Sequence, residues 1–277
     1  MTGRPRDDRA DADRRHVRGQ GPLPLHVGTS GFDYPEWAGR IYPRRLPAGE
    51  RLAFYATLFP AVELNSTFYR LPTRKQCERW AGQVPPQFRF AVTASRYLTH
   101  VLRLRQPDEA VERMLERIEP LGDRLGPVLV QLPPDLPVDA GALDATLTAF
   151  DASAPPALHV RVALEPRHES WFAADVEAIL RDHGAALCRA DRRGERSPEW
   201  RTADWRYIRM HEGSAVPAGC YDSSDLAALA TRLAEEGTGT TGDWVFFNND
   251  GHACAPANAR TFSRLADRAG FEVLAPT

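Results

Sequence analysis

The amino-acid sequence predicts an α/β protein built as a single (β/α)8 TIM-type barrel, and three observations support this fold class. Eight strand-like segments alternate with helical patterns, which implies parallel strands joined by right-handed crossovers. The length of 277 residues fits one barrel of about 250 residues. Within Leu158–His168, aliphatic residues alternate with Arg161, Ala163 and Glu165, so this strand has an aliphatic face and a partly charged face. Such a strand is expected where a helix covers the barrel outside and a polar site lies inside.

Several of the predicted strands repeat this arrangement of one aliphatic and one polar face. In chain order the strand-like segments are Leu25–Gly31, Ala61–Thr67, Phe88–Ser95, Val128–Leu132, Leu158–Glu165, Ala185–Asp191, Arg206–His211 and Trp244–Asn248. The inward face of the first and the last strand is ambiguous, and at the last strand both Asn248 and Asn249 are candidates for the inward position.

Helical patterns separate most of these strands. Pro107–Leu121 begins with Pro-Asp-Glu, which favours a helix start. Trp171–His183 has Ser170 as its expected N-cap and Gly184 just past its end. The other predicted helices are Glu50–Phe59, Arg74–Gln83, Ala140–Phe150, Asp222–Glu236 and Ala257–Ala269. No change in composition marks a second domain, so one domain is predicted over residues 25–277.

Residues 1–24 are polar and charged without periodicity, and we expect them to form a disordered tail. No apolar run approaches the roughly 18 residues that a membrane span needs, so no membrane association is expected. Four scattered cysteines form no CxxC pair and are expected to be reduced thiols of a cytoplasmic protein: Cys77, Cys188, Cys220 and Cys254. The net charge of −2 gives no argument for bulk binding of nucleic acid.

Residues on the polar face of each strand should point to the barrel axis. These are Glu63, Asn65 and Thr67, then Arg89, Ala91 and Thr93, then Leu129 and Gln131, and finally Tyr207, Arg209 and His211. Arg189 and Asp191 share one face of their strand. Because an unpaired buried ion costs several kcal/mol, Arg161, Arg189 and Arg209 need partners, and Glu63, Glu165 and Asp191 are the expected ones. A self-satisfied ion network inside the barrel is the structural alternative to a site.

Six collinear motifs resemble the YecE-like family, domain of unknown function 72. They are HVGTSGFDYPEW, FYATLFPAVELNSTFYRLPT, VLVQLPP, EPRHESWF, YIRMHEG and FFNND, and the resemblance runs from about Leu25 to Ala269. It implies a (β/α)8-type barrel but no activity. Two positions depart from the family pattern: Thr93 stands where members often have Lys, and Glu212 is inserted after His211 where members tend to read His-Gly.

The candidate catalytic residues are Glu165, His211 and Asp191, each at or near a strand end. A partly desolvated carboxylate there can titrate nearer neutrality, which suits Glu165 as a general base. His211 is the candidate acid–base histidine, and His100 reaches either the same mouth or the surface. The three candidate residues could also bind Mg²⁺, Mn²⁺ or Zn²⁺, although no HxH or HExxH spacing supports a metal.

Guanidinium groups can grip a carboxylate or phosphate, and amides suit hydroxyl groups. The candidate substrate-binding residues are Asn65, Thr67, Tyr69, Gln131, Arg167, His168, Trp171, Arg209, Asn248 and Asn249. The sequence therefore predicts acid–base or hydrolytic chemistry, as in a hydrolase, lyase or isomerase, on a small polar or anionic substrate. The alternatives are a non-catalytic protein that binds nucleic acid or a sugar-phosphate chain through arginines and loop aromatics, and a metal-dependent phosphoesterase.

Overall fold

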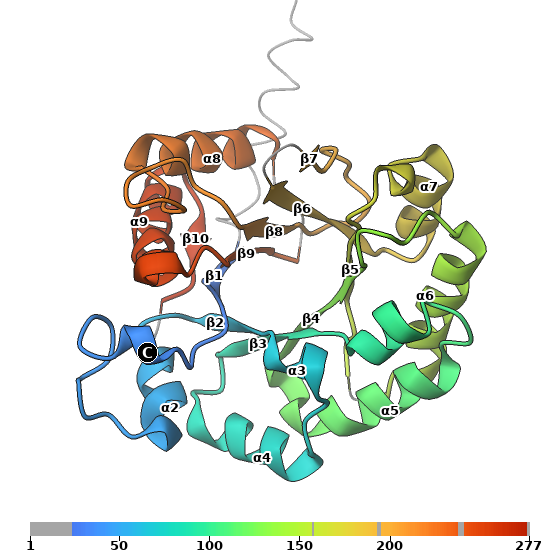
Figure 1. Ribbon diagram of the computed structural model, residues 1–277, viewed down its shortest axis with the longest axis horizontal. Coiled ribbons are helices and arrows are strands. Elements are labelled where there is room, and N and C mark those ends of the chain that lie inside the picture. Colours follow the sequence, from blue (N-terminus) through green and yellow to red (C-terminus); the bar gives the residue numbers. More distant parts are fainter. Residues whose placement is uncertain (1–23, 157, 193–194, 238–240, 276–277) are drawn as a thin grey trace, which may run out of the picture.

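The structure is a computed structural model that describes residues 24–156, 158–192, 195–237 and 241–275, and the described strands form a closed parallel barrel (Figure 1). Its eight strands are β1 (Pro24–Ser30), β2 (Ala61–Leu64), β3 (Arg89–Thr93), β4 (Leu125–Gln131), β5 (Val162–Glu165), β6 (Ala186–Arg192), β8 (Tyr207–Met210) and β9 (Asp243–Phe247). They follow one another in chain order, and β1 pairs with β9 to close the ring. The predicted α/β class and (β/α)8 architecture are therefore confirmed. The predicted tail lies outside the described residues up to position 23.

Helices cover the outside of the barrel (Figure 1). They are α2 (Arg51–Ala56), α4 (Arg74–Gln83), α5 (Asp108–Ile118), α6 (Ala140–Ser153), α7 (Ala174–Asp182), α8 (Ser223–Glu235) and α9 (Cys254–Arg268). The short helix α3 (Ser66–Tyr69) follows β2 and lies at the C-terminal end of the barrel instead (Figure 1). Short turns of helix precede or follow some of them: η1 (Pro35–Trp37), η2 (Ala48–Glu50), η3 (Tyr97–Val101), η4 (Glu119–Arg124), η5 (Glu169–Trp171) and η6 (Gly251–Ala253). Thr73, Asp139 and Asp222 cap α4, α6 and α8 by accepting a backbone N–H with their side chains.

The connection between β6 and β8 differs from the other connections. Its described residues contain the two-residue strand β7 (Glu195–Arg196), which pairs antiparallel with β6, and no helix. A pocket lies there, between α8 and the outer faces of β6 and β8. A last short strand, β10 (Glu272–Val273), extends the sheet beside β1.

Aromatic rings fill the N-terminal half of the barrel interior. Trp244 stacks on His26 with ring centroids 3.8 Å apart. The Arg161 guanidinium lies over the rings of Trp205 and Trp244, 5.7 and 5.4 Å from their centroids. Burial, followed by repulsion from Arg161 and Arg89, lowers the pKa of His26 to about 3, so this histidine is neutral at pH 7. The polar residues of the interior are thus concentrated toward the C-terminal half.

Three details of the predicted elements are wrong. Strand β2 ends at Leu64, and Thr67 lies in α3, where its Oγ1 donates to the carbonyls of Leu64 and Thr93. Helix α7 begins at Ala174, because Ser170 belongs to the preceding turn η5 and does not cap it. The fifth strand begins at Val162, four residues later than predicted at Leu158.

The arginine partners expected from the sequence are only partly right. Arg209 pairs with buried glutamates, as described below. Arg189 instead pairs with Glu236, with Nη1 2.5 Å from Oε2. Arg161 packs on tryptophan rings rather than on one of the predicted carboxylates. Both residues differ from Arg209 in position: Arg189 lies on the outer face of β6, and Arg161 lies just before β5 begins.

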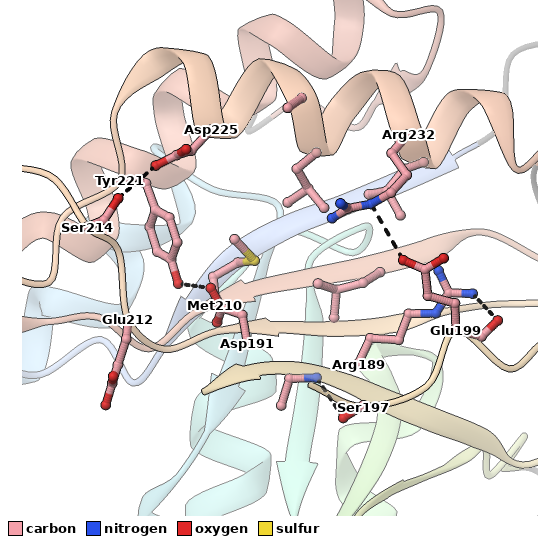
Figure 2. Close-up of a pocket in the computed structure, with 15 residues that line it drawn as sticks. Arg189, Asp191, Ser197, Glu199, Met210, Glu212, Ser214, Tyr221, Asp225 and Arg232 are labelled. Atoms are coloured by element: carbon pink, nitrogen blue, oxygen red, sulfur yellow. Dashed lines mark hydrogen bonds and ion pairs between the residues drawn. The ribbon is translucent and has the colours of Figure 1, made fainter. Parts of the chain in front are cut away.

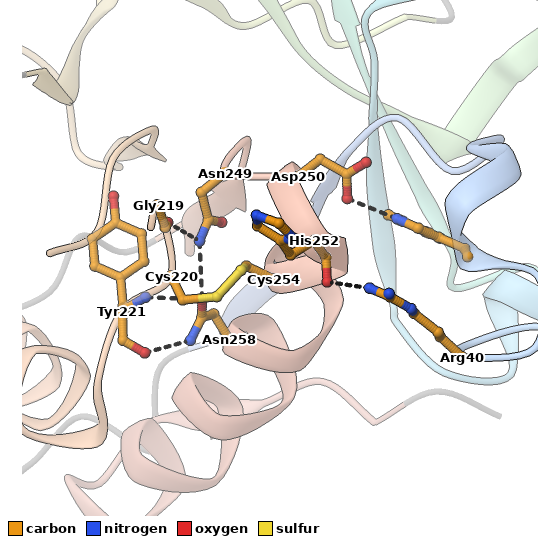
Figure 3. The surroundings of a disulfide bond; sticks show 10 residues. Arg40, Gly219, Cys220, Tyr221, Asn249, Asp250, His252, Cys254 and Asn258 are labelled. Atoms are coloured by element: carbon orange, nitrogen blue, oxygen red, sulfur yellow. Dashed lines mark hydrogen bonds between the residues drawn. A yellow bond between two sulfur atoms is a disulfide. The ribbon is translucent and has the colours of Figure 1, made fainter. Parts of the chain in front are cut away.

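The expectation of four reduced thiols is also wrong. A disulfide joins Cys220, in the connection after β8, to Cys254, the first residue of α9 (Figure 3). The same two segments are held by Asn258, whose side chain accepts from Tyr221 N and donates to Tyr221 O. Cys77 and Cys188 are buried and lie outside this disulfide. Residues 34 positions apart in the sequence meet because the loops after β8 and β9 are neighbours.

The contacts of His183 with two aspartates predict a modest pH dependence of the protein's stability. It follows α7 and bridges to α6, with Nδ1 2.7 Å from Asp151 Oδ2 and Nε2 3.2 Å from Asp144 Oδ1. Burial lowers its pKa, but the two carboxylates outweigh burial and raise it above the ordinary value. A raised folded-state pKa gives stability that is complete below pH about 6.5 and is lost as the pH rises through the folded-state value. Chemical denaturation should therefore show a larger stability deficit for His183→Gln at acidic than at alkaline pH; an equal deficit would contradict this assignment.

Within the described residues, no helix is both long and apolar enough to cross a bilayer.

Candidate functional site

Three buried side chains form an ion network below the C-terminal mouth of the barrel. Arg209 Nη2 lies 2.8 Å from Glu63 Oε1, and Arg209 Nη1 donates to Glu165 Oε2. Both carboxylates are 0% exposed. A buried carboxylate is costly unless a cation and hydrogen bonds compensate it. The three side chains therefore depend on one another, and the predicted pairing of Arg209 with the two glutamates is present.

Neighbouring strands complete the hydrogen bonds of Glu63. Tyr207 Oη donates to Glu63 Oε2 at 2.6 Å, and Ser30 Oγ donates to Oε1. Burial alone would lower the pKa of Arg209, but its attraction to Glu165 and Glu63 outweighs burial and raises the pKa well above the ordinary value. Arg209 is therefore a fixed cation beneath the mouth.

Glu165 connects this network to the mouth above it. Gln131 Nε2 donates to Glu165 Oε1 at 3.1 Å. Arg167 Nε and His211 Nε2 lie 3.8 and 3.6 Å from the same oxygen. Side chains at or near the ends of three strands thus converge on one carboxylate, as the inward parity of β4, β5 and β8 predicted.

His211 is oriented by Asn248. The Asn248 amide Nδ2 lies 3.1 Å from His211 Nδ1 and donates to it. When Nδ1 accepts this bond, the proton of a neutral imidazole is on Nε2, which faces Glu165. The His211 side chain is almost completely buried, so this pair stands behind the wall of the mouth rather than in it.

An open pocket of about 460 Å³ occupies the mouth, and we call it the mouth pocket. It is lined by Ser30, Asn65, Phe68, Tyr69, Thr93, Arg96, His100, Gln131, Arg167, Arg209 and Asn248. These residues come from strand ends and from the loops that follow them, which is where parallel β/α barrels carry their active sites. The volume is that of a small-molecule site.

The lining of the mouth pocket is cationic. It contains Arg96, Arg167 and Arg209 and no carboxylate. Arg209 is balanced from below by buried glutamates, whereas Arg96 is exposed at the rim. His100 stands beside them; burial, then repulsion from Arg167 and Arg96, lowers its pKa. A neutral imidazole therefore lies among guanidinium groups.

Thr93 adds to the mouth pocket a hydroxyl group whose hydrogen bonds are unfilled. Its side chain lines the mouth pocket and is 3% exposed, yet Oγ1 has no hydrogen-bond partner among the described residues. A buried hydroxyl without a partner costs free energy. The Oγ1 atom therefore favours a bound molecule or water in this pocket.

The structure brings eight predicted site residues to the mouth. Those that line the mouth pocket are Asn65, Tyr69, Gln131, Arg167, Arg209 and Asn248. Glu165 and His211 lie directly beneath and beside them. The ambiguity at the last strand is resolved: Asn248 faces the mouth, and Asn249 is buried with its Nδ2 on Gly219 O and Asn258 Oδ1.

Three further predicted residues have structural contacts instead. Thr67 bonds two backbone carbonyls, as described above. The Nδ1 atom of His168 accepts from Ser170 N at the start of η5. Trp171 is fully buried and donates its Nε1 proton to Leu136 O. None of the three lines the mouth pocket, and neither does Asn249.

Asp191 lies on the opposite face of its strand from the mouth. Its Oδ1 accepts from His211 N at 2.6 Å, and its Oδ2 accepts from Tyr221 Oη. Leu187, on the same parity of β6, packs in the outer core under the helices. Among the described residues no group of three His, Cys, Asp or Glu side chains is arranged to hold a metal ion, so Glu165, Asp191 and His211 are not brought together as a ligand set.

Sequence reasoning missed three residues of the mouth pocket, Ser30, Phe68 and Arg96. Arg96 follows β3 by three positions in the loop ASRYLTH, and a charge just past a strand end was the available signal. Ser30 ends β1, whose inward face could not be assigned from the sequence. His100 was considered for the mouth or the surface, and the structure places it in the pocket.

Comparison with known proteins places the chain in a family. The sequence model described as "Protein of unknown function DUF72" matches residues 26–277. The UPF0759 protein YecE of Escherichia coli (strain K12) is 30% identical over 165 residues, 58% of this chain and 54% of that protein. The UPF0759 protein YunF of Bacillus subtilis (strain 168) is 28% identical over 116 residues, 40% of each chain. The matched part thus spans about half, or less, of these curated relatives.

The solved structures agree with this assignment. A crystal structure of a DUF72 family protein from Thermotoga maritima is 30% identical with a TM-score of 0.73, and the match covers 88% of this chain and 99% of that chain. The chain therefore belongs to the DUF72 family, and the YecE-like resemblance of its motifs is confirmed.

Proposed function

We propose that the mouth pocket binds a small anionic substrate and carries out acid–base or hydrolytic chemistry on it. The observation that supports this proposal most directly is the lining: three arginines and no carboxylate around a pocket of about 460 Å³. A carboxylate or phosphate gains charge-assisted hydrogen bonds from guanidinium groups in such a setting. The amides of Asn65, Gln131 and Asn248 suit the polar remainder of the molecule.

His100 is the group best placed to exchange a proton with the bound substrate. It lines the pocket, and its lowered pKa keeps it neutral and able to accept a proton at pH 7. Its Nδ1 is 2.8 Å from Thr99 Oγ1, so Nε2 is the ring nitrogen offered to a ligand. Glu165 and His211 then act mainly as positioning residues, because both are buried behind the wall and hold Arg209, Arg167 and Gln131.

Removing Arg167 should weaken anion binding. The guanidinium supplies one of the cationic contacts in the mouth pocket, so Arg167→Ala is expected to raise the Kd for inorganic phosphate by about tenfold or more, the value of one charge-assisted hydrogen bond. Titration calorimetry or ³¹P NMR measures this. Arg260→Ala, which removes an exposed arginine of α9, is the matched control and should leave the Kd unchanged. Equal effects of the two substitutions would contradict the proposed site.

The catalytic half of the proposal needs a separate test. Wild-type protein is incubated with a panel of small carboxylates and phosphate esters, and hydrolysis and solvent-deuterium exchange are followed by NMR at several pH values. Any turnover that belongs to this site should fall by about 10²-fold or more in His100→Asn, as is usual for loss of a general acid–base group. Turnover that survives this change would remove His100 from the mechanism.

A nucleic acid or sugar-phosphate chain is a second candidate ligand because of Tyr69. This ring is 75% exposed at the rim of the mouth pocket and packs edge-on against Phe68, 5.0 Å between centroids. An exposed aromatic beside arginines suits stacking of a base or sugar. Fluorescence anisotropy with short single-stranded DNA and RNA distinguishes this reading: it requires binding that weakens steeply with salt and with Tyr69→Ala. The absence of binding at low salt would leave the small anionic substrate as the ligand.

A further inference from the structure

A second pocket lies outside the barrel, where the connection between β6 and β8 has no helix among its described residues. We call it the outer pocket. It has a volume of about 380 Å³ and lies between α8 and the outward faces of β6 and β8. Its floor is apolar and includes Ile208, Met210 and Leu229. A pocket with this volume and an apolar floor is of the kind that takes an organic ligand of moderate size.

The charges at one end of the outer pocket are already paired. Figure 2 shows Arg189, Glu199 and Arg232 together at that end. Arg232 Nε is 3.9 Å from Glu199 Oε1, and Arg189 is bound to Glu236 beside the pocket. This end therefore offers little net charge to a ligand.

The other end carries a carboxylate that has only neutral donors. Asp191 accepts from Tyr221 Oη and from the backbone N–H of His211, and no described arginine, lysine or histidine side chain forms an ion pair with it. Asp225 stands nearby on α8, where its carboxylate accepts from Ser214 Oγ (Figure 2). Burial raises the pKa of Asp191, because taking the carboxylate out of water disfavours its charged form and its hydrogen bonds offset this only in part. A cation in the outer pocket would supply the missing compensation.

We propose that the outer pocket binds an organic amine whose ammonium group pairs with Asp191. The apolar body of the amine lies along α8 and covers Met210 and Leu229. Two independent features support this ligand. The apolar floor favours a hydrophobic body, because apolar surface is then removed from water. The partly buried carboxylate of Asp191 favours a positive charge, because a charge in such a place is costly without a partner. The inference does not depend on the function proposed for the mouth pocket. The two sites are nevertheless neighbours, because the backbone N–H of His211, whose side chain lies beside the mouth pocket, donates to Asp191 in the outer pocket.

Three probes of similar shape test the charge requirement: phenethylamine, 2-phenylethanol and 3-phenylpropanoate. Titration calorimetry with the full chain should show saturable binding of the amine, and binding at least about tenfold weaker for the alcohol and the carboxylate. ¹H–¹⁵N shifts should locate the amine at α8 and β8. Equal binding of the amine and the carboxylate, or no saturable binding of the amine, would overturn the proposal.

Two substitutions and a control test the location. Asp191→Asn should weaken the amine at least about tenfold and bring it level with the alcohol. Ala228→Trp adds an indole to the exposed part of the lining and should abolish binding without disturbing the core, so the test remains decisive even if Asp191→Asn folds poorly. Thr231→Trp places the same ring on α8 outside the lining and should bind the amine like wild type. Unchanged binding in Ala228→Trp would refute the site.

Discussion

Replacing Arg209 with methionine should reduce the free energy of unfolding by about 3–5 kcal/mol, the cost of removing one partner of a buried ion network. The change leaves Glu63 and Glu165, both 0% exposed, without the guanidinium that lies between them. Their hydrogen bonds from Tyr207 and Gln131 remain, and Arg167 Nε stays 3.8 Å from Glu165 Oε1, but within the described part of the chain Glu63 is left with neutral donors only. Urea denaturation at pH 7, monitored by tryptophan fluorescence, measures the loss.

One comparison separates charge from packing in this experiment. The uncharged triple variant Glu63→Gln, Glu165→Gln and Arg209→Met should recover much of the loss, because no buried charge remains. A variant as stable as wild type at pH 7 would mean that water reaches the two glutamates.

Arg232→Met is the matched control for this prediction. Arg232 forms its ion pair with Glu199 at 3.9 Å, and both side chains are more than half exposed. Exposed pairs contribute at most about 1 kcal/mol. The control should therefore stay within about 0.5 kcal/mol of wild type. The contrast between Arg209 and Arg232 tests whether burial, rather than the ion pair itself, sets the cost.

The barrel and the centre of the mouth were predictable from the sequence because both depend on period-two alternation. In β2, β4 and β8, every second residue is aliphatic and packs under a helix, so the alternate positions Glu63, Gln131 and Arg209 had to face the axis. The same argument misplaces Asp191. In β6 the outward parity is itself polar after Leu187, because Arg189 and Asp191 face the pocket that lies between this strand and α8.

Residues in loops were harder to predict, because no periodicity fixes where a loop side chain points. Arg96 and His100 reach the mouth pocket through η3, a one-turn π-helix that the sequence pattern did not reveal. The residues Thr67, His168 and Trp171 have the chemistry of ligand-binding groups but are used to anchor backbone and turns. The chemical type of a loop residue alone therefore could not distinguish residues that line the mouth pocket from residues with purely structural contacts.

Breaking the disulfide between Cys220 and Cys254 is expected to have the second large effect. The bond closes a loop whose ends are 34 positions apart, and a cross-link of this span stabilises a protein by about 2–4 kcal/mol, chiefly by restricting the unfolded chain. The double variant Cys220→Ala, Cys254→Ala should lose this amount in urea denaturation. A reductant should lower the stability of wild type to that of the variant and leave the variant unchanged.

Thiol counting gives this prediction an independent check. In denaturant without reductant, alkylation followed by mass spectrometry should label Cys77 and Cys188 only, and all four cysteines after reduction. Labelling of four thiols from the start would show that the bond is absent in the isolated protein, as the scattered cysteines first suggested.

The disulfide also bears on the outer pocket. The bond holds the loop after β8 against α9, and Tyr221, next to Cys220, donates its hydroxyl proton to Asp191. Reduction should therefore weaken amine binding in the outer pocket. Phosphate binding in the mouth pocket should stay unchanged, because the residues that line the mouth pocket do not include this loop.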